Sequence, residues 1–137
     1  MNNLSFHITD ITANSIRANA SEIGLSVEEQ DTRIVIRITD NGSGMDAETA
    51  RRVTNPFYTT RTTRKVGPGL PFLIQNAEQT GGSVTLTSEP GKGTEVRAVF
   101  HSDHIDCPPW GDLPGTVALL ITGNPEINVC FEYRSGE

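Results

Sequence analysis

Long hydrophobic runs are absent from this 137-residue sequence. No window reaches the roughly 18 consecutive apolar residues that a membrane-spanning helix needs. The N-terminal stretch MNNLSFHITD also lacks the basic start and apolar centre of a secretory signal peptide. We therefore expect a cytoplasmic protein that has no membrane partner.

Cysteine is also scarce, with two residues in the chain. Cys107 and Cys130 lie far apart and neither belongs to a C-x-x-C pair, which argues against a disulfide framework and against a structural zinc site. At this length we expect one domain with one hydrophobic core. The formal net charge of -6 argues against general binding of nucleic acid.

Acidic residues are missing from one segment, which runs from residue 49 to residue 77. Its cations are Arg51, Arg52, Arg61, Arg64 and Lys65. Residues 54–69 show no periodicity and are rich in threonine and glycine, so we predict a long functional loop there. A segment with this charge is suited to meeting an anion.

Periodicity in the rest of the chain predicts both helices and strands. Apolar residues at helical spacing predict an amphipathic helix over residues 4–20. The other predicted elements are strands over residues 22–30 and 33–40, a short helix over 47–53, a helix over 70–80, and a hairpin of strands over 83–88 and 94–100. After these come a proline-broken loop, an apolar stretch over residues 116–123 and a strand-like segment over 128–133.

The stretch DNGSGM, residues 40–45, follows a strong strand pattern and allows several interpretations. Asn-Gly is a hairpin signal, but the residues after Met45 have a helical pattern and offer no second strand. The stretch also matches a dinucleotide-binding fingerprint, but the required acidic residue about 20 positions later is missing. A third interpretation makes Asp40 the functional group, because a carboxylate accepts the hydrogen bond that the adenine amine donates. The alternative is an ordinary loop with a solvated aspartate.

A second polar pattern lies in the first predicted helix. Asp10, Asn14 and Arg17 stand at positions i, i+4 and i+7, and therefore on one face. Such a face can offer a carboxylate to orient an attacking hydroxyl or water, an amide oxygen to Mg²⁺, and a guanidinium to a phosphate. Taken alone, a polar stripe of this kind is usually just a solvated helix face.

Two further segments carry groups that suit a ligand. Gly67 and Gly69 come directly before a helix N-terminus, where backbone N–H groups and the helix dipole favour phosphate. Thr94 begins the last strand of the hairpin and offers a hydroxyl to a polar pocket. Each segment alone is also explained as a simple turn.

Together, and in this order, these segments resemble the histidine-kinase-like ATPases, the superfamily that includes gyrase, Hsp90, sensor histidine kinases and MutL. The similar stretches are DITANSIRANA (N box), DNGSGM (G1 box), NPFYTT (F box), RKVGPGLPF (G2 box) and TGGSVTLTSEPGKGTEVRAVF (the closing strand pair of the sensor-kinase branch). The resemblance implies an α/β two-layer sandwich of the Bergerat type, with helices on one face of a mixed, mostly antiparallel sheet. Residues 1–100 would form the ATP-binding domain, and residues 101–137 a C-terminal extension packed on it.

The resemblance also implies ATP and Mg²⁺ as ligands and gives roles to single residues. Asn14 would hold Mg²⁺ and Asp40 would read the adenine amine. Asp10 matches the position of a catalytic glutamate base, although aspartate is one methylene shorter. The residues implied to bind ATP, under a lid over about residues 55–67, are Asn14, Arg17, Ala18, Asp40, Gly42, Gly44, Met45, Arg64, Lys65, Val66, Gly67, Pro68, Gly69, Leu70 and Thr94.

Two functions are compatible with the resemblance. In the first, the domain transfers the γ-phosphoryl group of Mg-ATP to a histidine or serine of an unidentified partner protein, because we find no phosphoacceptor module and His7 lies inside the ATP-site helix. In the second, the domain is a switch or weak ATPase whose lid orders over ATP and presents a surface to a partner. Pro68 and Pro71 depart from the usual G2 pattern and are expected to restrict the lid.

The loop after the hairpin suggests a weaker alternative, a metal site. Its candidate ligands are His101, Asp103, His104, Asp106 and Cys107. Their spacing fits no standard site, so a solvated loop is the better interpretation.

Overall fold

A computed structural model describes residues 3–54 and 69–136 of the chain. Its elements, in chain order, are α1 (Leu4–Arg17), β1 (Glu22–Gln30), β2 (Arg33–Asp40), α2 (Ala47–Thr54), α4 (Gly69–Gln79), β3 (Ser83–Glu89), β4 (Gly93–His101), α5 (Leu113–Gly123) and β5 (Asn128–Ser135). The loop predicted over residues 54–69 falls almost wholly outside the described residues and stays a prediction. Within the described ranges, no helix has the length and apolar character needed to cross a membrane.

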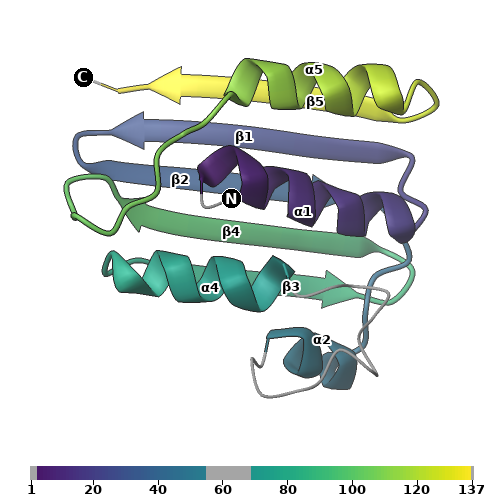
Figure 1. Ribbon diagram of the computed structural model, residues 1–137. Coiled ribbons are helices and arrows are strands. Elements are labelled where there is room, and N and C mark those ends of the chain that lie inside the picture. Colours follow the sequence, from purple (N-terminus) through teal and green to yellow (C-terminus); the bar gives the residue numbers. More distant parts are fainter. Residues whose placement is uncertain (1–2, 55–68, 137) are drawn as a thin grey trace.

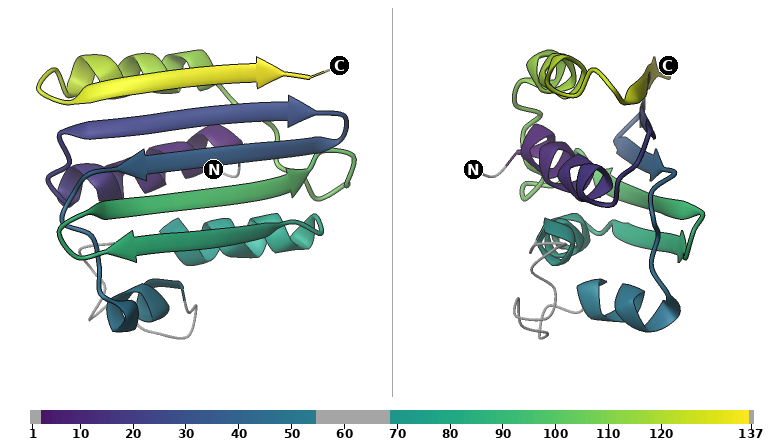
Figure 2. Two further views of the ribbon diagram at one scale, coloured as in Figure 1. Left: turned by 180° about the vertical axis from the view of Figure 1, so that it is seen from behind. Right: turned by 90° about the vertical axis from the view of Figure 1, so that its right-hand side faces the viewer.

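The strands form one five-stranded sheet in the order β3-β4-β2-β1-β5. Neighbouring strands run antiparallel, except that β1 and β5 run parallel. Helices α1, α4 and α5 all lie on one face of the sheet, and none of the described helices covers the other face (Figure 1, Figure 2). The predicted two-layer α/β sandwich with a mixed, mostly antiparallel sheet is confirmed.

Buried apolar residues alternate with more exposed ones along the strands, and the buried ones hold the sheet to the helices. Ile23, Leu25 and Val27 of β1 are all buried, and the residues between them are less so. Leu25 lies opposite Ile38 of β2, and Val27 lies opposite Ile36. Burial of each such side chain contributes about 2 kcal/mol. The register is therefore fixed, because a slip of one residue would turn the whole set outward.

Helix α1 packs on this layer through one apolar stripe. Leu4, Ile8 and Ile11 are each at most 3% exposed, which confirms the stripe predicted from their spacing. The helix begins after Asn3, whose side-chain oxygen accepts a hydrogen bond of 2.6 Å from the backbone N–H of Phe6. This contact satisfies one of the N–H groups that a helix start leaves without a partner.

The predicted end of this helix, at Ala20, is wrong. The helix ends at Arg17, and Asn19 adopts a left-handed backbone with φ of 64°. The backbone N–H of Ala20 then turns back to the carbonyl of Ser15, 3.2 Å away. A left-handed residue of this kind closes a helix, and asparagine tolerates that conformation better than most residues.

The residues after β4 return to the same sheet. Their loop is tied to the start of α1, because the backbone N–H groups of Leu4 and Ser5 donate to the carbonyls of Pro109 (2.8 Å) and Trp110 (3.0 Å). The apolar stretch forms α5, which begins at Leu113 after the capping residue Asp112 and buries Val117 and Leu120. The strand-like segment forms β5, which pairs with β1 at the edge of the sheet.

His7 is a buried titratable residue in α1, with 1% of its surface exposed. Its ring lies near those of Phe72 and Phe100, with centroids 5.2 and 6.4 Å away. Its Nε2 lies 2.8 Å from the side-chain nitrogen of Asn76. That nitrogen donates, so Nε2 accepts and the ring proton resides on Nδ1, which has no partner among the described residues. Burial lowers the pKa of His7 to about 4.

We expect the free energy of unfolding to decrease as the pH falls from 6.5 to about 4. In this range the unfolded chain protonates His7 and the folded chain does not. The contribution is therefore complete above pH 6.5 and is lost towards pH 4, by up to about 3 kcal/mol. Urea denaturation at several pH values should show this loss in the natural protein and a flatter dependence in His7→Leu. His104→Leu, which alters an exposed histidine, should keep the natural dependence. If the free energy of unfolding depends on pH in the same way in all three proteins, this role of His7 is contradicted.

Candidate functional site

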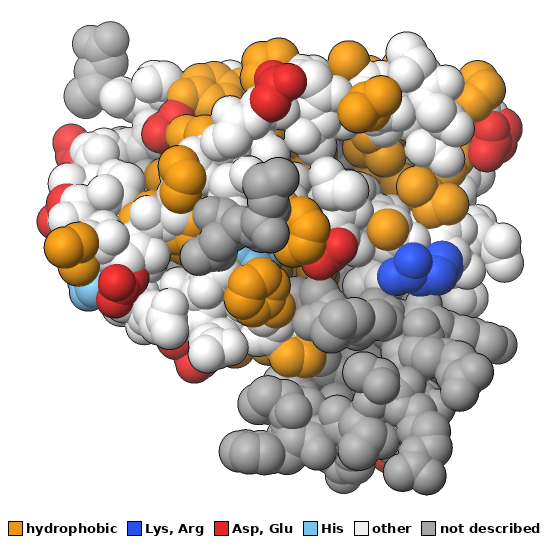
Figure 3. Space-filling view, viewed as in Figure 1, with side chains coloured by type: hydrophobic (Ala, Val, Ile, Leu, Met, Phe, Trp, Pro, Cys, Tyr) orange, Lys and Arg blue, Asp and Glu red, His pale blue; other side chains and the backbone are white. Residues whose placement is uncertain are grey.

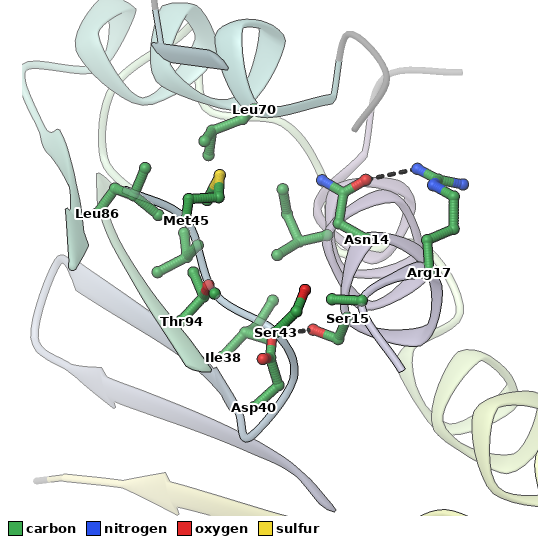
Figure 4. A pocket seen from close by; sticks show the side chains of 14 residues that line it. Asn14, Ser15, Arg17, Ile38, Asp40, Ser43, Met45, Leu70, Leu86 and Thr94 are labelled. Carbon is green, nitrogen blue, oxygen red and sulfur yellow. Dashed lines mark hydrogen bonds between the residues drawn. The ribbon is translucent and has the colours of Figure 1, made fainter. Parts of the chain in front are cut away.

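A pocket of about 270 Å³ lies between α1, α4 and the strands β2, β3 and β4 (Figure 4). This volume is near the lower end of the range for small-molecule sites. Of the fourteen lining residues, seven have apolar side chains, six have polar or charged side chains, and one is a glycine. The lining residues are Ile11, Asn14, Ser15, Arg17, Ala18, Ile38, Asp40, Ser43, Gly44, Met45, Leu70, Leu86, Thr94 and Val96.

Many of the residues predicted from the sequence therefore lie around one cavity. Those that line it are Asn14, Arg17, Ala18, Asp40, Gly44, Met45, Leu70 and Thr94. Gly42 does not line it but contacts Asp40. Gly69 is the first residue of α4, beside Leu70. Arg64, Lys65, Val66, Gly67 and Pro68 lie outside the described residues, and their predicted roles are not tested.

Asp40 is the last residue of β2, and its carboxylate is held by two hydrogen bonds. Ser15 Oγ donates to one carboxylate oxygen at 2.6 Å, and the backbone N–H of Gly42 donates to the other at 2.9 Å. Ser15 is 2% exposed, so its hydroxyl is shielded from water that would compete. Together the two donors hold the carboxylate in one fixed orientation.

The backbone after Asp40 passes through a crowded region that only glycine fits. Gly44 has φ of +71°, and a Cβ built there would lie 1.9 Å from the carbonyl oxygen of Glu89. A Cβ at Gly42 would lie 2.8 Å from Ala18. The loop is also bonded on both sides: Ser43 N–H donates to Ala18 O (2.9 Å), and its carbonyl accepts from Gly91 N–H (2.7 Å). The loop is thus clamped between α1 and the β3–β4 turn.

Apolar side chains form the walls of the pocket. Figure 4 shows Met45, Leu70 and Leu86 around one side of the cavity and Ile38 beside Asp40. Leu70 is 3% exposed and belongs to the first turn of α4. A cavity with aliphatic walls and one fixed carboxylate offers van der Waals contact to a flat ring and a single directed hydrogen bond.

Asn14 and Arg17 supply the polar side of the pocket, from the last two turns of α1. The guanidinium of Arg17 donates a hydrogen bond to Oδ1 of Asn14 (Figure 4). This is the amide oxygen that the resemblance assigns to Mg²⁺. Arg17 therefore occupies one of the two lone pairs of that oxygen, and its positive charge opposes a cation there.

Asp10 lies on the same helix but is not among the described residues that line the pocket. Its side chain is partly buried, and this burial raises the pKa of the carboxyl, while the charge of Arg17 acts in the opposite direction. A raised pKa is the direction expected for a general base. Its position one turn before Asn14 leaves it beside the pocket.

Thr94 lies directly across from Asp40 in the β2–β4 ladder. Its hydroxyl lies 2.8 Å from the hydroxyl of Ser88, which also accepts a hydrogen bond of 2.8 Å from the backbone N–H of Met45. Among the described residues, no hydrogen bond joins the side chains of Thr94 and Asp40. The sequence patterns do not predict a role for Ser88 or Ser15. Their hydrogen bonds to Met45 and Asp40 join segments that lie far apart in the sequence.

The loop after β4 supplies no metal centre within the described part of the chain. No group of three or more His, Cys, Asp or Glu side chains there is arranged to hold a metal ion. His104 and Asp106 do interact, since the backbone N–H of Asp106 donates to the His104 ring at 3.0 Å. The interpretation as a solvated loop agrees with the exposure of both residues.

The molecule is an α/β sandwich of one helical layer and one mixed sheet, with a pocket that the Asp40 carboxylate lines. The model of the family Histidine kinase-, DNA gyrase B-, and HSP90-like ATPase matches residues 3–104, and the chain belongs to this family. The resemblance drawn from the sequence motifs is thereby confirmed. The chain is an ATP-binding domain of the kinase-like type.

Curated relatives and a solved structure agree with this assignment. A putative sensor protein of Shewanella frigidimarina is 31% identical over 97 residues, which cover 68% of this chain and 15% of that protein. Sensor histidine kinase YxdK of Bacillus subtilis is 29% identical over 104 residues, covering 71% and 32%. The chain thus spans less than a third of either relative. The fold is similar to that of the Aquifex aeolicus MutL ATPase domain complexed with ADP (TM-score 0.58, 16% identity, 97% of this chain and 60% of that chain).

We expect Gly44→Ala to lower the free energy of unfolding by about 3 kcal/mol or more, because the new methyl group meets a backbone carbonyl as well as an unfavourable φ. Gly91→Ala is the matched control. Gly91 has a similar φ of +78° but open space around a Cβ, so the loss should be about 1 kcal/mol. Urea denaturation of both variants measures the difference. Equal losses would show that the close approach of the loop to Glu89 is not required.

Proposed function

We propose that this domain binds ATP in the pocket described above and transfers its γ-phosphoryl group to a histidine or serine of a partner protein. The observation that carries the proposal is the Asp40 carboxylate, held by Ser15 and Gly42 beside apolar walls. This carboxylate accepts a hydrogen bond from the exocyclic amine of adenine. Guanine would present an oxygen there, and two acceptors repel each other. The arrangement therefore favours adenine over guanine.

The apolar walls would hold the base in place. Ile38, Met45 and Leu86 offer aliphatic surface on which a flat ring can pack. The loop of residues 41–46, here called the glycine loop, is clamped in place, and Met45 is fixed because its backbone N–H donates to Ser88. Because these side chains are already held in place, the entropic cost of ordering them when a nucleotide binds is smaller.

Asn14 and Arg17 would act on the phosphates. One amide oxygen suits Mg²⁺, which usually keeps several waters and takes few protein ligands beside phosphate oxygens. The bound ion would neutralise charge on the transferred phosphoryl group. Arg17 would exchange its hydrogen bond with Asn14 for a phosphate oxygen, which a guanidinium binds through two donors.

Other features support the acceptor and the setting that we propose. Relatives named sensor histidine kinases support a histidine acceptor, which we place on a partner protein. A cytoplasmic location is part of the proposal, because Cys107 and Cys130 are free thiols that suit a reducing compartment.

A switch with little turnover is the second candidate function. It is favoured by Asp10, whose short side chain does not line the pocket among the described residues. Phosphoryl transfer depends more on positioning and charge neutralisation than on a strong base, so Asp10 does not decide between the two. Incubation with γ-labelled ATP and candidate partner proteins separates them: a kinase labels its partner, and a switch binds it without labelling it.

We expect ATP to raise the thermal midpoint of the natural protein and GTP to leave it nearly unchanged. Binding to the folded state stabilises it by about 3 kcal/mol when the nucleotide is at about 100 times its Kd. Asp40→Asn should abolish the ATP shift, because its amide group presents a donor as well as an acceptor. Asp103→Asn makes the same charge change at an exposed loop and should keep the shift. An unchanged ATP shift in Asp40→Asn would refute the role of Asp40.

We also expect Asn14→Ala to separate the binding of Mg²⁺ from the binding of the base. In the natural protein, the ATP-induced shift should be larger with Mg²⁺ than with EDTA. In Asn14→Ala the two shifts should become similar, while the shift in EDTA remains, because Asp40 and the apolar walls are intact. If Mg²⁺ enlarges the ATP-induced shift of the thermal midpoint as much in the variant as in the natural protein, Asn14 is excluded as a ligand of the ion.

A further inference from the structure

The two edges of the sheet differ in how they are covered. At one edge, α2 packs against β3, and Figures 1 and 2 show it beside that strand. At the other edge, β5 pairs with β1 on one side, and none of the described residues pairs with its outer side. Every second residue of β5 therefore directs its backbone N–H and C=O outward, as a template for another strand.

The sequence of β5 has few of the common protections of an edge strand, and its charged residues are Glu132 and Arg134. NVCFEYRS has no proline and no lysine, and it is rich in residues that favour strands. The strand is 8 residues long, and 7 of these are exposed. Phe131 and Tyr133 on the helix side are 37% and 46% exposed, which is unusual for aromatic side chains of a small domain. The edge is thus long and partly apolar, and it is available for pairing.

We propose that a second copy of this chain pairs with β5 in antiparallel fashion, about a two-fold axis at Tyr133, and extends the sheet across the dimer. Side chains of the two copies stay on matching faces of the extended sheet only when odd-numbered residues pair with odd-numbered ones and even with even. This condition limits the possible registers. With Tyr133 on the axis, Glu132 of each copy lies opposite Arg134 of the other. With Glu132 or Arg134 on the axis, that residue would lie opposite the same residue of the second copy, so two like charges would meet. With Phe131 on the axis, neither charge meets an opposite charge.

The charges of β5 are therefore complementary to themselves in one register. Within one copy, Arg134 lies 3.6 Å from Glu132, so both side chains stand on the same face of the strand. In the dimer, each would have a partner across the axis as well, giving a cluster of four charges with no net charge. Opposite charges directly across a pair of strands stabilise the pair, and like charges destabilise it.

The helix side of the same edge adds apolar surface. The two-fold axis is perpendicular to the sheet, so both helical layers lie on the same side of the extended sheet and the two α5 helices are neighbours. Leu119 and Ile121 of α5 are 73% and 45% exposed. Figure 3 shows hydrophobic side chains exposed along the upper edge of the molecule, where α5 lies. Phe131 and Tyr133 of β5 lie on the face of the sheet that the helices cover, since they pair with the buried residues Leu25 and Val27.

The test measures the dimer dissociation constant of the full chain by sedimentation at several protein concentrations. Glu132→Arg should weaken the dimer by about tenfold or more, because the introduced arginine would face Arg134 in both symmetric pairs. Arg134→Glu should weaken it similarly. The double variant Glu132→Arg, Arg134→Glu restores opposite charges in the same register and should recover the natural constant. Glu78→Arg makes the same charge change on α4 and should have no effect.

Each outcome either supports or overturns the proposal. A concentration-dependent dimer with rescue by the double variant supports the Tyr133-centred register. A monomer at every concentration overturns the proposal and leaves the β5 edge to a different partner. A dimer that is indifferent to Glu132→Arg, or one that a folded double variant does not restore, places the interface elsewhere. Asp40→Asn should dimerise as the natural protein does, so failure of nucleotide binding is distinguishable from failure of this proposal.

Discussion

The hydrogen bond from Ser15 to Asp40 joins the helical layer to the sheet where the pocket forms. It is 2.6 Å long and links residues 25 positions apart in the sequence. A bond of this kind to a charged acceptor contributes about 2 kcal/mol when it is shielded from water. Its geometry depends on the packing of α1, since Ile8 and Ile11 set the height and rotation of the helix over β2. The position of the carboxylate is therefore a consequence of the hydrophobic core.

The glycine loop connects the end of α1 to the β3–β4 turn on the far side of the pocket, and so fixes the position of that turn as well. Ser43 bonds to Ala18 at the end of α1 and to Gly91 in the β3–β4 turn. Gly44 lets the chain pass against the carbonyl of Glu89, where any side chain would collide. Three segments distant in sequence are thus held at fixed spacing around one cavity. These contacts keep the walls of the pocket apart.

Sequence patterns predicted the parts of this structure that depend on local spacing. The alternation of β1 and β2, the stripe of α1 and the positions of Asp40, Asn14 and Arg17 all follow from periods of two or 3.6 residues and short motifs. Contacts between distant segments could not be predicted in this way: a serine such as Ser15 carries no signal of the carboxylate it will meet. The pairing of β5 with β1 was missed for the same reason, because a parallel strand is placed by a crossover and not by a turn.

The layout of the sheet separates the two properties that we assign to this domain. The described residues that line the pocket come from α1, β2, β3, β4, α4 and the glycine loop, and none comes from β1, α5 or β5. The sheet order places β1 between β2 and β5, so a second copy on β5 would meet the molecule on the side away from β3 and β4. Pairing there would leave the described pocket residues uncovered. A nucleotide could change such a dimer through α1, which packs against both α5 and β2 and bears Asn14 and Arg17 on its pocket side. It could also act through the sheet, where β2 pairs with β1 and β1 pairs with β5. Coupling through the helical layer would appear as a movement of α1 relative to α5, and neither site needs this movement for its own binding.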